Sequence, residues 1–263
     1  MTDPFDLTGT IAVVTGASGH LGPAMVAALA EAGATVHAVA RNAERLAAAM
    51  LPLREAGLDV VDAPCDVTSP QWADLLSAVT AEHGRLDVLL NNAHIGHGGS
   101  LRTATEEQFD EAYALAVKST WHGIGAARPG LRAAAAAGGS PVVVNVSSMY
   151  GLVAPDPRLY DTEEGRNPPY YGAVKAALVQ LTRYAAAELG PEGIRVNSIT
   201  PGPFPARAAQ ADPAFLRRLA GRTMLERIGR PDDLQTAVLF LASPASRFVT
   251  GINVPVDGGW TAW

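Results

Sequence analysis

Two kinds of segment alternate along the chain. Short runs rich in β-branched residues are separated by longer amphipathic segments rich in Ala and Leu. Apolar runs of this length between amphipathic segments predict strands joined by helices, as in the βαβ units of a parallel sheet. The predicted strands are seven in number: 10–15, 34–40, 58–63, 86–91, 141–147, 194–199 and 252–256.

Residues that start and stop helices agree with this pattern. Ser69 followed by Pro70 opens one predicted helix, Thr105 with Gln108 matches a capping box before another, and Gly33 closes the first. Because the predicted strands are continuous apolar runs, helices should cover both faces of the sheet. We therefore expect an α/β fold with a doubly wound, mostly parallel sheet, whose ligands bind at the carboxyl ends of the strands.

Composition narrows the range of functions. The chain has 263 residues, of which 48% are apolar and 17% charged, so we expect one folded domain over residues 1–263. The net charge is −6 with scattered Lys and Arg, which argues against a nucleic-acid partner and an anionic membrane surface. Cys65 is the single cysteine. The N-terminal segment MTDPFDLTGT shows no basic region followed by an apolar run, and we find no stretch of about 18 uncharged apolar residues. These features predict a cytoplasmic protein.

The segment TGASGHLG, residues 15–22, joins the first predicted strand to the first helix. Glycines there let the backbone turn tightly and approach a pyrophosphate, whose charge meets the helix N-terminus. An ordinary strand-to-helix turn is the alternative. The residues expected to hold a nucleotide are Gly16, Ser18, Gly19, His20, Leu21 and Gly22.

Cofactor choice is predicted from the end of the second strand. Arg41 occupies the place where an acidic residue would favour a free ribose 2′-hydroxyl, and its guanidinium suits a 2′-phosphate. We therefore expect NADP(H) to be preferred, with NAD(H) as the other candidate and a solvated surface Arg as the alternative. Asp66 and Val67 follow the third strand and are expected beside the adenine, although Asp66 also suits a helix cap.

Several short motifs occur in a fixed order over nearly the whole chain. They are TGASGHLG, CDV, NNA (91–93), NVSS (145–148), YGAVK (171–175), NSITPGP (197–203) and VDGG (256–259). This ordered set resembles the short-chain dehydrogenases/reductases. The resemblance implies a single Rossmann-like domain, a nicotinamide cofactor and interconversion of carbonyls and alcohols.

Two tyrosines compete for a catalytic role in PYYGAVK, residues 169–175. Residues four apart on a helix lie one above the other, so Tyr171 rather than Tyr170 faces Lys175. The resemblance also assigns the catalytic tyrosine and lysine to Tyr171 and Lys175, and the catalytic serine to Ser148. A solvated Tyr/Lys pair on a helix surface is the alternative.

Each of these three residues has an expected task. Reduction of a ketone leaves an alkoxide that takes a proton, which we expect Tyr171 to supply. The ammonium of Lys175 should lower the pKa of Tyr171, and the resemblance implies that it also holds the nicotinamide ribose. The Ser148 hydroxyl should hydrogen-bond the carbonyl oxygen. By the same resemblance, cofactor contacts also come from Asn92, Ala93, Pro201 and Gly202, together with Tyr171 and Lys175.

Three positions depart from the family pattern. Position 20 is His where the family spacing places Gly, and His94 replaces the Gly of NNAG. In AVKST, residues 116–120, Lys118 stands where we place the Asn of the family's catalytic tetrad, so Lys118 is a candidate for the catalytic set. Because an ammonium cannot act as an acceptor, either the helix turns Lys118 away or the proton relay differs. An impaired relay predicts that Lys118→Asn raises turnover, and a solvent-directed Lys is the plain alternative.

Residues near the expected site mouth bear on the substrate. His94 and His97 lie three apart in HIGHGG, but a Gly-rich loop without a third ligand does not predict a metal site, and substrate contact is the better interpretation. Residues 152–169 form an insertion rich in Pro and charge, and residues 203–229 resemble the substrate lid. The insertion's candidates for contact with a polar or acidic substrate are Arg158, Tyr160, Glu163 and Arg166.

The leading function is therefore an NAD(P)-dependent oxidoreductase acting on a polar ketone or secondary alcohol related to sugars, polyols or keto acids. A lyase, dehydratase or epimerase that reuses Tyr171 and Lys175 is one alternative, and a catalytically silent nucleotide-binding protein is another. A homo-oligomer is also expected, either a dimer or a homotetramer. Trp260 and Trp263 near the chain end should be buried at a subunit contact or against the lid.

Overall fold

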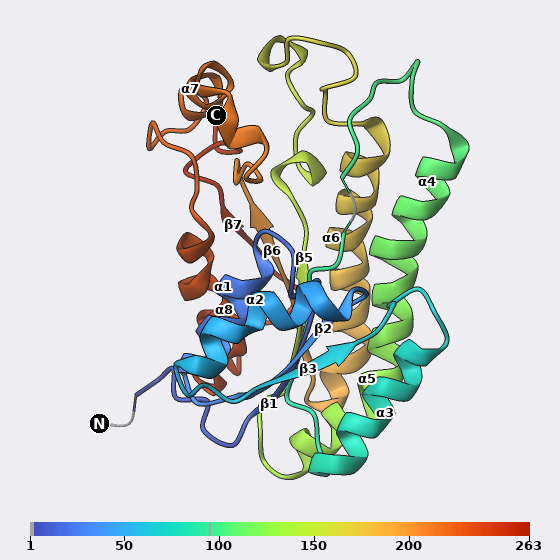
Figure 1. Cartoon of the computed structure of the whole chain (residues 1–263). Helices are drawn as coiled ribbons and strands as arrows, with labels where there is room; N and C mark the ends of the chain where they lie inside the picture. The colour runs from blue at the N-terminus through green and yellow to red at the C-terminus, as the bar shows by residue number, and fades with distance from the viewer. Residues whose placement is uncertain (1–2, 95) are drawn as a thin grey trace.

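A parallel sheet of seven strands forms the centre of the structure (Figure 1). The structure is a computed structural model that describes residues 3–94 and 96–263. The strands run in the order β3-β2-β1-β4-β5-β6-β7, and every neighbouring pair is parallel. Their bounds are β1 (Ile11–Thr15), β2 (Thr35–Ala40), β3 (Val60–Pro64), β4 (Val88–Asn91), β5 (Val142–Val146), β6 (Arg195–Pro201) and β7 (Asn253–Val256). The seven strands predicted from the apolar runs are confirmed.

Helices cover both faces of the sheet, as a doubly wound fold requires. One layer contains α1 (Gly22–Glu31), α2 (Ala43–Glu55) and α8 (Gln235–Ala242). The other contains α3 (Gln71–His83), α5 (Ser119–Ala136) and α6 (Pro169–Leu189), with α4 (Glu106–Tyr113) packed against α6. A further short helix, α7 (Pro213–Ala220), lies in the expected lid. Within the part of the chain that the structure describes, no helix combines the length and the apolar character of a membrane span.

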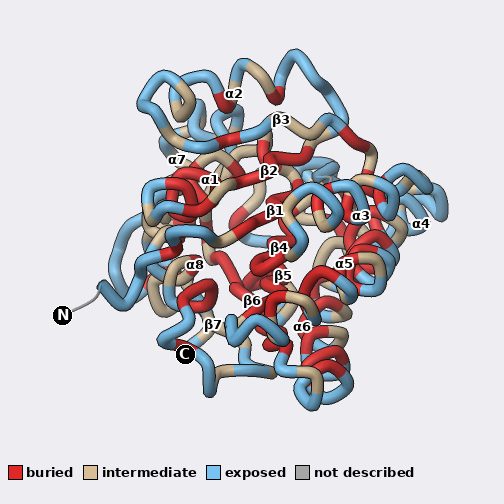
Figure 2. Tube along the Cα trace, turned by 90° about the horizontal axis from the view of Figure 1, so that it is seen from below, coloured by how far each residue is buried: buried red, intermediate tan, exposed pale blue. Residues whose placement is uncertain are grey.

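Burial follows the sheet order. Residues of β1, β4, β5 and β6 are buried throughout, and Figure 2 shows them as the buried centre of the molecule. The edge strands differ, because β3 and β7 are each mostly half-buried or exposed. The apolar runs of the inner strands thus reflect cover on both faces, whereas the edge strands have fewer neighbours.

Helix ends agree with the local signals in the sequence, with small shifts. Thr105 and Gln108 form the predicted capping box, and Gly33 follows α1 with φ at +97°. Pro70 is the N-cap of α3, while the Ser69 hydroxyl donates to the carbonyl of Asp66. Pro201, expected just beyond the sixth strand, is instead the last residue of β6, paired with Val256.

The strand order reverses between β1 and β4, which places a topological switch point at their carboxyl ends. The Thr15 hydroxyl accepts hydrogen bonds from the backbone N–H groups of Asn92, at 3.0 Å, and Ala93, at 3.1 Å. The Asn92 side chain donates to the carbonyls of Thr15 and Gly16, both at 3.2 Å. These bonds join the loop after β1 to the loop after β4 at the place where this fold binds ligands.

A buried polar chain fixes the neighbouring strands. The Asn91 side chain on β4 donates to Asn145 on β5 at 2.9 Å, and Asn145 donates to the Thr182 hydroxyl on α6 at 2.9 Å. Asn145 is fully buried, so these partners replace the water that its amide loses on folding. The chain therefore sets the position of α6 relative to the two central strands.

We predict that Asn145→Ala lowers the free energy of unfolding by roughly 2–4 kcal/mol, because it leaves the Asn91 amide without its acceptor and opens a small cavity. Urea unfolding followed by circular dichroism measures the change. Ser77→Ala on the exposed face of α3 is the control and should change stability by less than about 0.5 kcal/mol. Equal stability of the two variants would contradict a tethering role for Asn145.

Candidate active site

Ser148, Tyr171 and Lys175 come together beyond the carboxyl end of β5. Ser148 is the N-cap of the 3-10 helix η2 (Met149–Gly151), and its hydroxyl accepts from the Tyr150 backbone N–H at 3.2 Å. Tyr171 and Lys175 lie in the first two turns of α6, which begins at Pro169. Ser148 lies close enough to Tyr171 to lower its pKa, and Lys175 Nζ lies 5.8 Å from the centroid of the Tyr171 ring. The structure thus brings together the three residues that the resemblance selected.

Two glycines allow this cluster to form. A Cβ atom at Gly151 would lie 2.7 Å from the carbonyl carbon of Lys175, and one at Gly172 would lie 2.7 Å from the carbonyl oxygen of Tyr150. Each glycine therefore permits η2 and α6 to approach backbone to backbone. The Ser147 hydroxyl donates to the carbonyl of Lys175 at 2.7 Å and closes the same contact.

Lys175 is a buried cation held by a backbone carbonyl. Its side chain is 2% exposed, and Nζ donates to the carbonyl of Val146 at 2.8 Å. Burial disfavours the charged form and lowers the pKa of Lys175 from 10.5 to about 8. Lys175 therefore exchanges its proton closer to neutral pH than an exposed lysine does.

The pKa of Tyr171 differs from the sequence-based expectation. Burial raises it above the ordinary value, and the Ser148 side chain opposes that rise. We expected the charge of Lys175 to lower the pKa of Tyr171, whereas the pKa is raised, with burial as the main cause. Tyr171 therefore holds its proton firmly, which suits a group that must donate it to a strongly basic alkoxide.

The adjacent tyrosine has a different environment. Tyr170 is fully buried and packs its ring edge-to-face against Phe109 of α4, with centroids 5.5 Å apart. Its hydroxyl is buried without a hydrogen-bond partner among the described residues. The helical spacing thus separates a packing tyrosine from the one beside Ser148 and Lys175.

The loop after β1 fits a nucleotide. Gly16 has φ at +67°, and a Cβ atom there would lie 2.9 Å from the Cα of Ala93. At Gly22 a Cβ atom would lie 2.4 Å from the Gly16 carbonyl oxygen, whereas at Gly19 it would meet that oxygen at 3.0 Å. The loop is therefore folded tightly against Asn92 and Ala93, and it leaves the N-terminus of α1 open to a phosphate. Ser18, His20 and Leu21 complete this turn, and Gly202 directly follows β6 and packs against Asp257.

The residues expected around the adenosine lie at the ends of β2 and β3. Arg41 is exposed, and its charge helps to lower the pKa of Asp66. One carboxylate oxygen of Asp66 accepts from both the backbone N–H and the hydroxyl of Thr68, at 2.9 and 2.7 Å. Asp66 thus stabilises its own turn and does not cap α3, whose N-cap is Pro70, while Arg41 remains close enough for its charge to act on Asp66. Val67, which was also expected beside the adenine, is buried.

Two of the three departures from the family pattern meet in the cleft. The His94 ring lies edge-to-face with Tyr171, with centroids 6.3 Å apart. The pKa of His94 lies below its ordinary value, because the surrounding protein partly desolvates the ring and because Lys175 and His20 add like charge, although the residue keeps an exposed edge. Burial also lowers the pKa of His20, whose Nε2 is buried with no partner in residues 3–94 and 96–263. Both rings are therefore neutral at neutral pH, and His20 retains an unused polar atom where a ligand would lie.

The third departure lies outside the cleft, and the catalytic placement of Lys118 is corrected. Lys118 ends a π-helix, η1 (Ala114–Lys118), between α4 and α5, and it is exposed. It lines a hollow of about 410 Å³ with Val67, Ser119 and His122. The residues of η1 that pack in the layer of Tyr170 and Tyr171 are Ala116 and Val117. The helix therefore turns Lys118 away, which removes the basis for expecting Lys118→Asn to raise turnover.

The insertion at 152–169 forms one wall of a hollow of about 610 Å³ opposite the loop that follows β4. Arg166 Nε and Asn167 Oδ1 are buried there without partners among the described residues. Tyr160 lines the same hollow, and its hydroxyl lies 2.9 Å from that of Tyr150. Glu163 is already bonded to Ser100 and Arg102, and Arg158 to Asp156. Of the four predicted contact residues, Arg166 thus has an unpartnered polar atom, and Tyr160 lines the hollow with its hydroxyl bonded to Tyr150.

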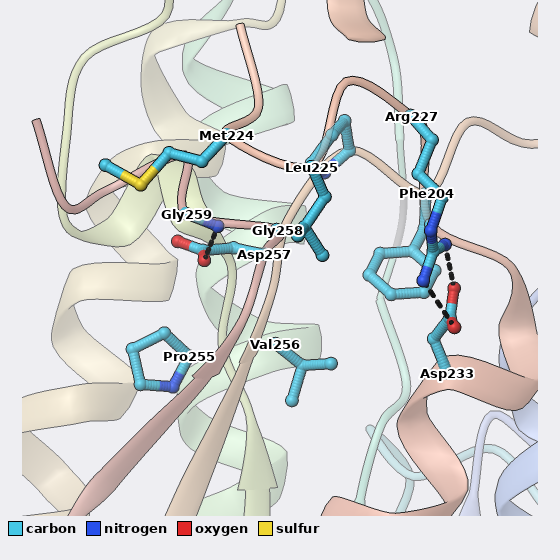
Figure 3. Close-up of a pocket in the computed structure, with 12 residues that line it drawn as sticks. Phe204, Met224, Leu225, Arg227, Asp233, Pro255, Val256, Asp257, Gly258 and Gly259 are labelled. Atoms are coloured by element: carbon cyan, nitrogen blue, oxygen red, sulfur yellow. Dashed lines mark hydrogen bonds and ion pairs between the residues drawn. The ribbon is translucent and has the colours of Figure 1, made fainter.

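The segment at 203–229, expected to be the lid, covers the ends of β6 and β7. Figure 3 shows Met224 and Leu225 against Gly258 and Gly259, around a separate hollow of about 440 Å³. A Cβ atom at Gly259 would lie 2.6 Å from Met224 Cγ, and a bidentate Arg227–Asp233 pair holds the end of the lid. This hollow lies beneath the lid, and neither Ser148 nor Tyr171 lines it.

The two C-terminal tryptophans differ. Trp260 is buried, with its ring edge-to-face with Tyr150 at 6.3 Å and below the Arg222 guanidinium of the lid at 5.8 Å. Burial against the lid, one of the two expected arrangements, therefore applies to Trp260. Trp263 is 71% exposed.

Comparisons with known proteins agree with this geometry. A family model described as enoyl-(acyl carrier protein) reductase matches residues 16–261. The rhamnolipid-biosynthesis 3-oxoacyl-[acyl-carrier-protein] reductase of Pseudomonas aeruginosa is 35% identical over 97% of this chain and 98% of its own. The cis-4-hydroxycyclohexanecarboxylate dehydrogenase of Sinomonas cyclohexanicum is 37% identical, with 96% of each chain covered. The solved active-site complex of Pseudomonas aeruginosa RhlG with NADP superposes with a TM-score of 0.88 at 34% identity, covering 99% of this chain and 100% of that one.

The lowered pKa of Lys175 predicts a specific dependence of stability on pH. Between about pH 8 and 10.5 the unfolded chain binds a proton at Lys175 that the folded chain does not, so this side chain's contribution to stability rises with pH. Over the full window the rise amounts to about 3 kcal/mol. Urea unfolding of the wild type and Lys175→Met across this range measures it, because other titrating groups cancel in the difference. A pH-independent difference between the two proteins would refute the lowered pKa.

Proposed function

Because the chain belongs to the short-chain dehydrogenase/reductase family, an oxidoreductase family, we propose that it interconverts a polar ketone and a secondary alcohol with NADP(H) as the preferred cofactor. The observation that carries the proposal is the cluster of Ser148, Tyr171 and Lys175 beyond the carboxyl end of β5, on the same edge of the sheet as the glycine loop. A bound nicotinamide nucleotide would supply or accept the hydride.

The chain's own residues transfer the proton and hold the substrate oxygen in place. Tyr171 gives its phenolic proton to the oxygen in the reductive direction and takes it back in the oxidative one. The Ser148 hydroxyl hydrogen-bonds the same oxygen and fixes its place beside Tyr171. Lys175, with a pKa of about 8, favours the tyrosinate that forms when Tyr171 loses its proton.

Arg41 is the basis for the NADP(H) preference. Its guanidinium stands at the end of β2 beside Asp66, where a ribose 2′-phosphate could pair with it in bidentate fashion. The NADP complex of the structural relative from Pseudomonas aeruginosa supports the use of a nicotinamide cofactor. Asp66 does not oppose the preference, since one of its oxygens is bonded to Thr68.

The polar character of the substrate follows from the insertion. The guanidinium Nε of Arg166 and the amide oxygen of Asn167, both buried without partners among the described residues, are suited to a substrate with a carboxylate and a hydroxyl. The Sinomonas relative is named for a hydroxycarboxylate, which agrees with this substrate class. His94 lies beside Tyr171 and is placed to contact the reacting end of the substrate.

We also propose that the protein works as a homo-oligomer, a dimer or homotetramer, in the cytoplasm. Large apolar side chains are exposed on helices α4, α5 and α6 and, separately, around β7, the two regions through which family members usually pair. The first group is Phe109, Tyr113, Trp121 and Tyr184, and the second is Phe248, Ile252 and Trp263.

Replacing each of the adjacent tyrosines tests the proposed chemistry. We expect Tyr171→Phe to reduce turnover by a factor of about 10² to 10⁴, because it removes the proton donor. Tyr170→Phe should retain turnover, since it removes a hydroxyl that has no partner among the described residues. The assay follows NADPH absorbance with a panel of short hydroxy ketones and keto acids. Comparable turnover in the two variants would exclude Tyr171 as the acid, and product formation without net NADPH oxidation would favour a non-redox function.

Cofactor preference has its own test. We expect wild-type protein to bind NADPH more tightly than NADH in fluorescence titrations, and Arg41→Ala to weaken NADPH binding about tenfold or more. NADH affinity should be unchanged in that variant, because NADH has no 2′-phosphate. Arg45→Ala, which changes an exposed arginine in the first turn of α2, is the control. Equal loss of both cofactors, or a wild-type preference for NADH, would contradict the role of Arg41.

A further inference from the structure

Two histidines from distant parts of the chain meet between β2 and the end of α3. His37 lies within β2 and is 4% exposed, and His83 is the last residue of α3. Their Nε2 atoms are 2.9 Å apart, and their rings are nearly perpendicular, at 72°. The sequence did not suggest this contact, because the two residues are 46 positions apart.

A buried imidazole at this place needs a partner. The neighbours of His37 along β2 are buried and apolar, and Val39 on the same face of the strand packs in the layer of α3. The Nε2 atoms of His37 and His83 face each other at 2.9 Å, and a neutral imidazole has one nitrogen lone pair available. Two neutral rings can share one N–H···N hydrogen bond, or both can direct a lone pair at one cation.

The spacing of the nitrogens suits the second arrangement. Two imidazole nitrogens bound to one tetrahedral zinc ion at about 2.0–2.1 Å lie roughly 3.3 Å apart, so a movement of a few tenths of an ångström would admit the ion. A hydrogen bond between the two rings satisfies one nitrogen of each ring but does not neutralise the negative charge of the nearby carboxylates.

That negative charge comes from two carboxylates. Glu82 Oε1 lies 3.8 Å from His83 Nε2, and donor atoms of His37, Glu82 and His83 all lie within 4.8 Å of one another. Glu82 has a side chain that is 66% exposed, so it can swing toward the nitrogens without disturbing the core. Asp59, which accepts from the Thr35 hydroxyl at 2.6 Å, adds a second negative charge at the start of β2.

We propose that His37, Glu82 and His83 form a binding site for a divalent transition-metal ion, with Zn²⁺ as the best fit and water in the fourth position. Two imidazoles and one carboxylate are a ligand set that zinc accepts, and harder cations such as Mg²⁺ prefer oxygen alone. The ion would join β2 to the end of α3, just before Gly84 ends that helix with φ at +71°. The role is structural and is independent of the proposed oxidoreductase activity.

The test uses full-length protein without a polyhistidine tag, treated with a chelator and then dialysed. Isothermal titration with Zn²⁺ should show one equivalent bound with micromolar or tighter affinity. The melting temperature should rise by about 5 °C at saturation. Titration with Co²⁺ should give the visible absorption bands of a four-coordinate ion, which report nitrogen and oxygen ligands directly.

Variants locate the ion. His83→Gln should weaken Zn²⁺ binding at least a hundredfold, and Glu82→Gln about tenfold, while both should fold because these side chains lie at the surface end of α3. His122→Gln, an exposed histidine on α5, is the matched control and should bind as the wild type does. His97→Gln tests the loop at 94–99, where His97 lies 3.9 Å from Glu111.

Three outcomes would overturn the proposal. Absence of Zn²⁺ binding by the wild type would show that His37 and His83 share only a hydrogen bond. Unchanged binding in His83→Gln would exclude these ligands. Binding lost in His97→Gln and kept in His83→Gln would move the ion to the loop after β4.

Discussion

The contact between α6 and the end of β5 is the constraint on which the rest of the site depends. Gly151 and Gly172 remove the side chains that would separate the two segments, and the Ser147 hydroxyl bonds to the Lys175 carbonyl across the contact. Because the backbones touch, Ser148 and Tyr171 meet and Lys175 is forced into the protein interior. The lowered pKa of Lys175 and the raised pKa of Tyr171 both follow from this burial. The fold thus sets the acid–base properties of the site by the distance between two chain segments.

The switch point between β1 and β4 places that chemistry beside the glycine loop. Thr15 and Asn92 fix the two loops to one another, and Gly16 lets them approach without a Cβ atom between them. His20 and His94 lie next to these loops, and partial desolvation, joined at His94 by the charge of Lys175, lowers the pKa of each ring. Their presence changes the surface offered to a ligand and leaves the backbone framework intact, so the departures from the family pattern bear on recognition rather than on the fold.

Local signals in the sequence were sufficient for the strands and for the choice of Tyr171, because apolar runs and the four-residue helical spacing depend on near neighbours. Lys118 was misplaced for a related reason. Its catalytic role was assigned from its position in a motif. The side of the helix on which Lys118 lies depends on the π-helix η1, whose wider turn holds one more residue than an α-helical turn. The shifted pKa values and the contact between His37 and His83 depend on segments far apart in the chain. No pattern within one segment contains that information.

The buried charge of Lys175 links the acid–base properties of the cleft to ligand binding. Lys175 is held by a carbonyl rather than by a carboxylate, and burial is the cause of its lowered pKa. An anion that enters such a cleft favours the ammonium form and raises that pKa again. Ligand binding and proton uptake at Lys175 are therefore coupled, and the same ammonium then favours the tyrosinate of Tyr171. Burying the lysine without a counter-charge thus makes the acid–base pair responsive to the anionic ligand that the glycine loop and the N-terminus of α1 are shaped to accept.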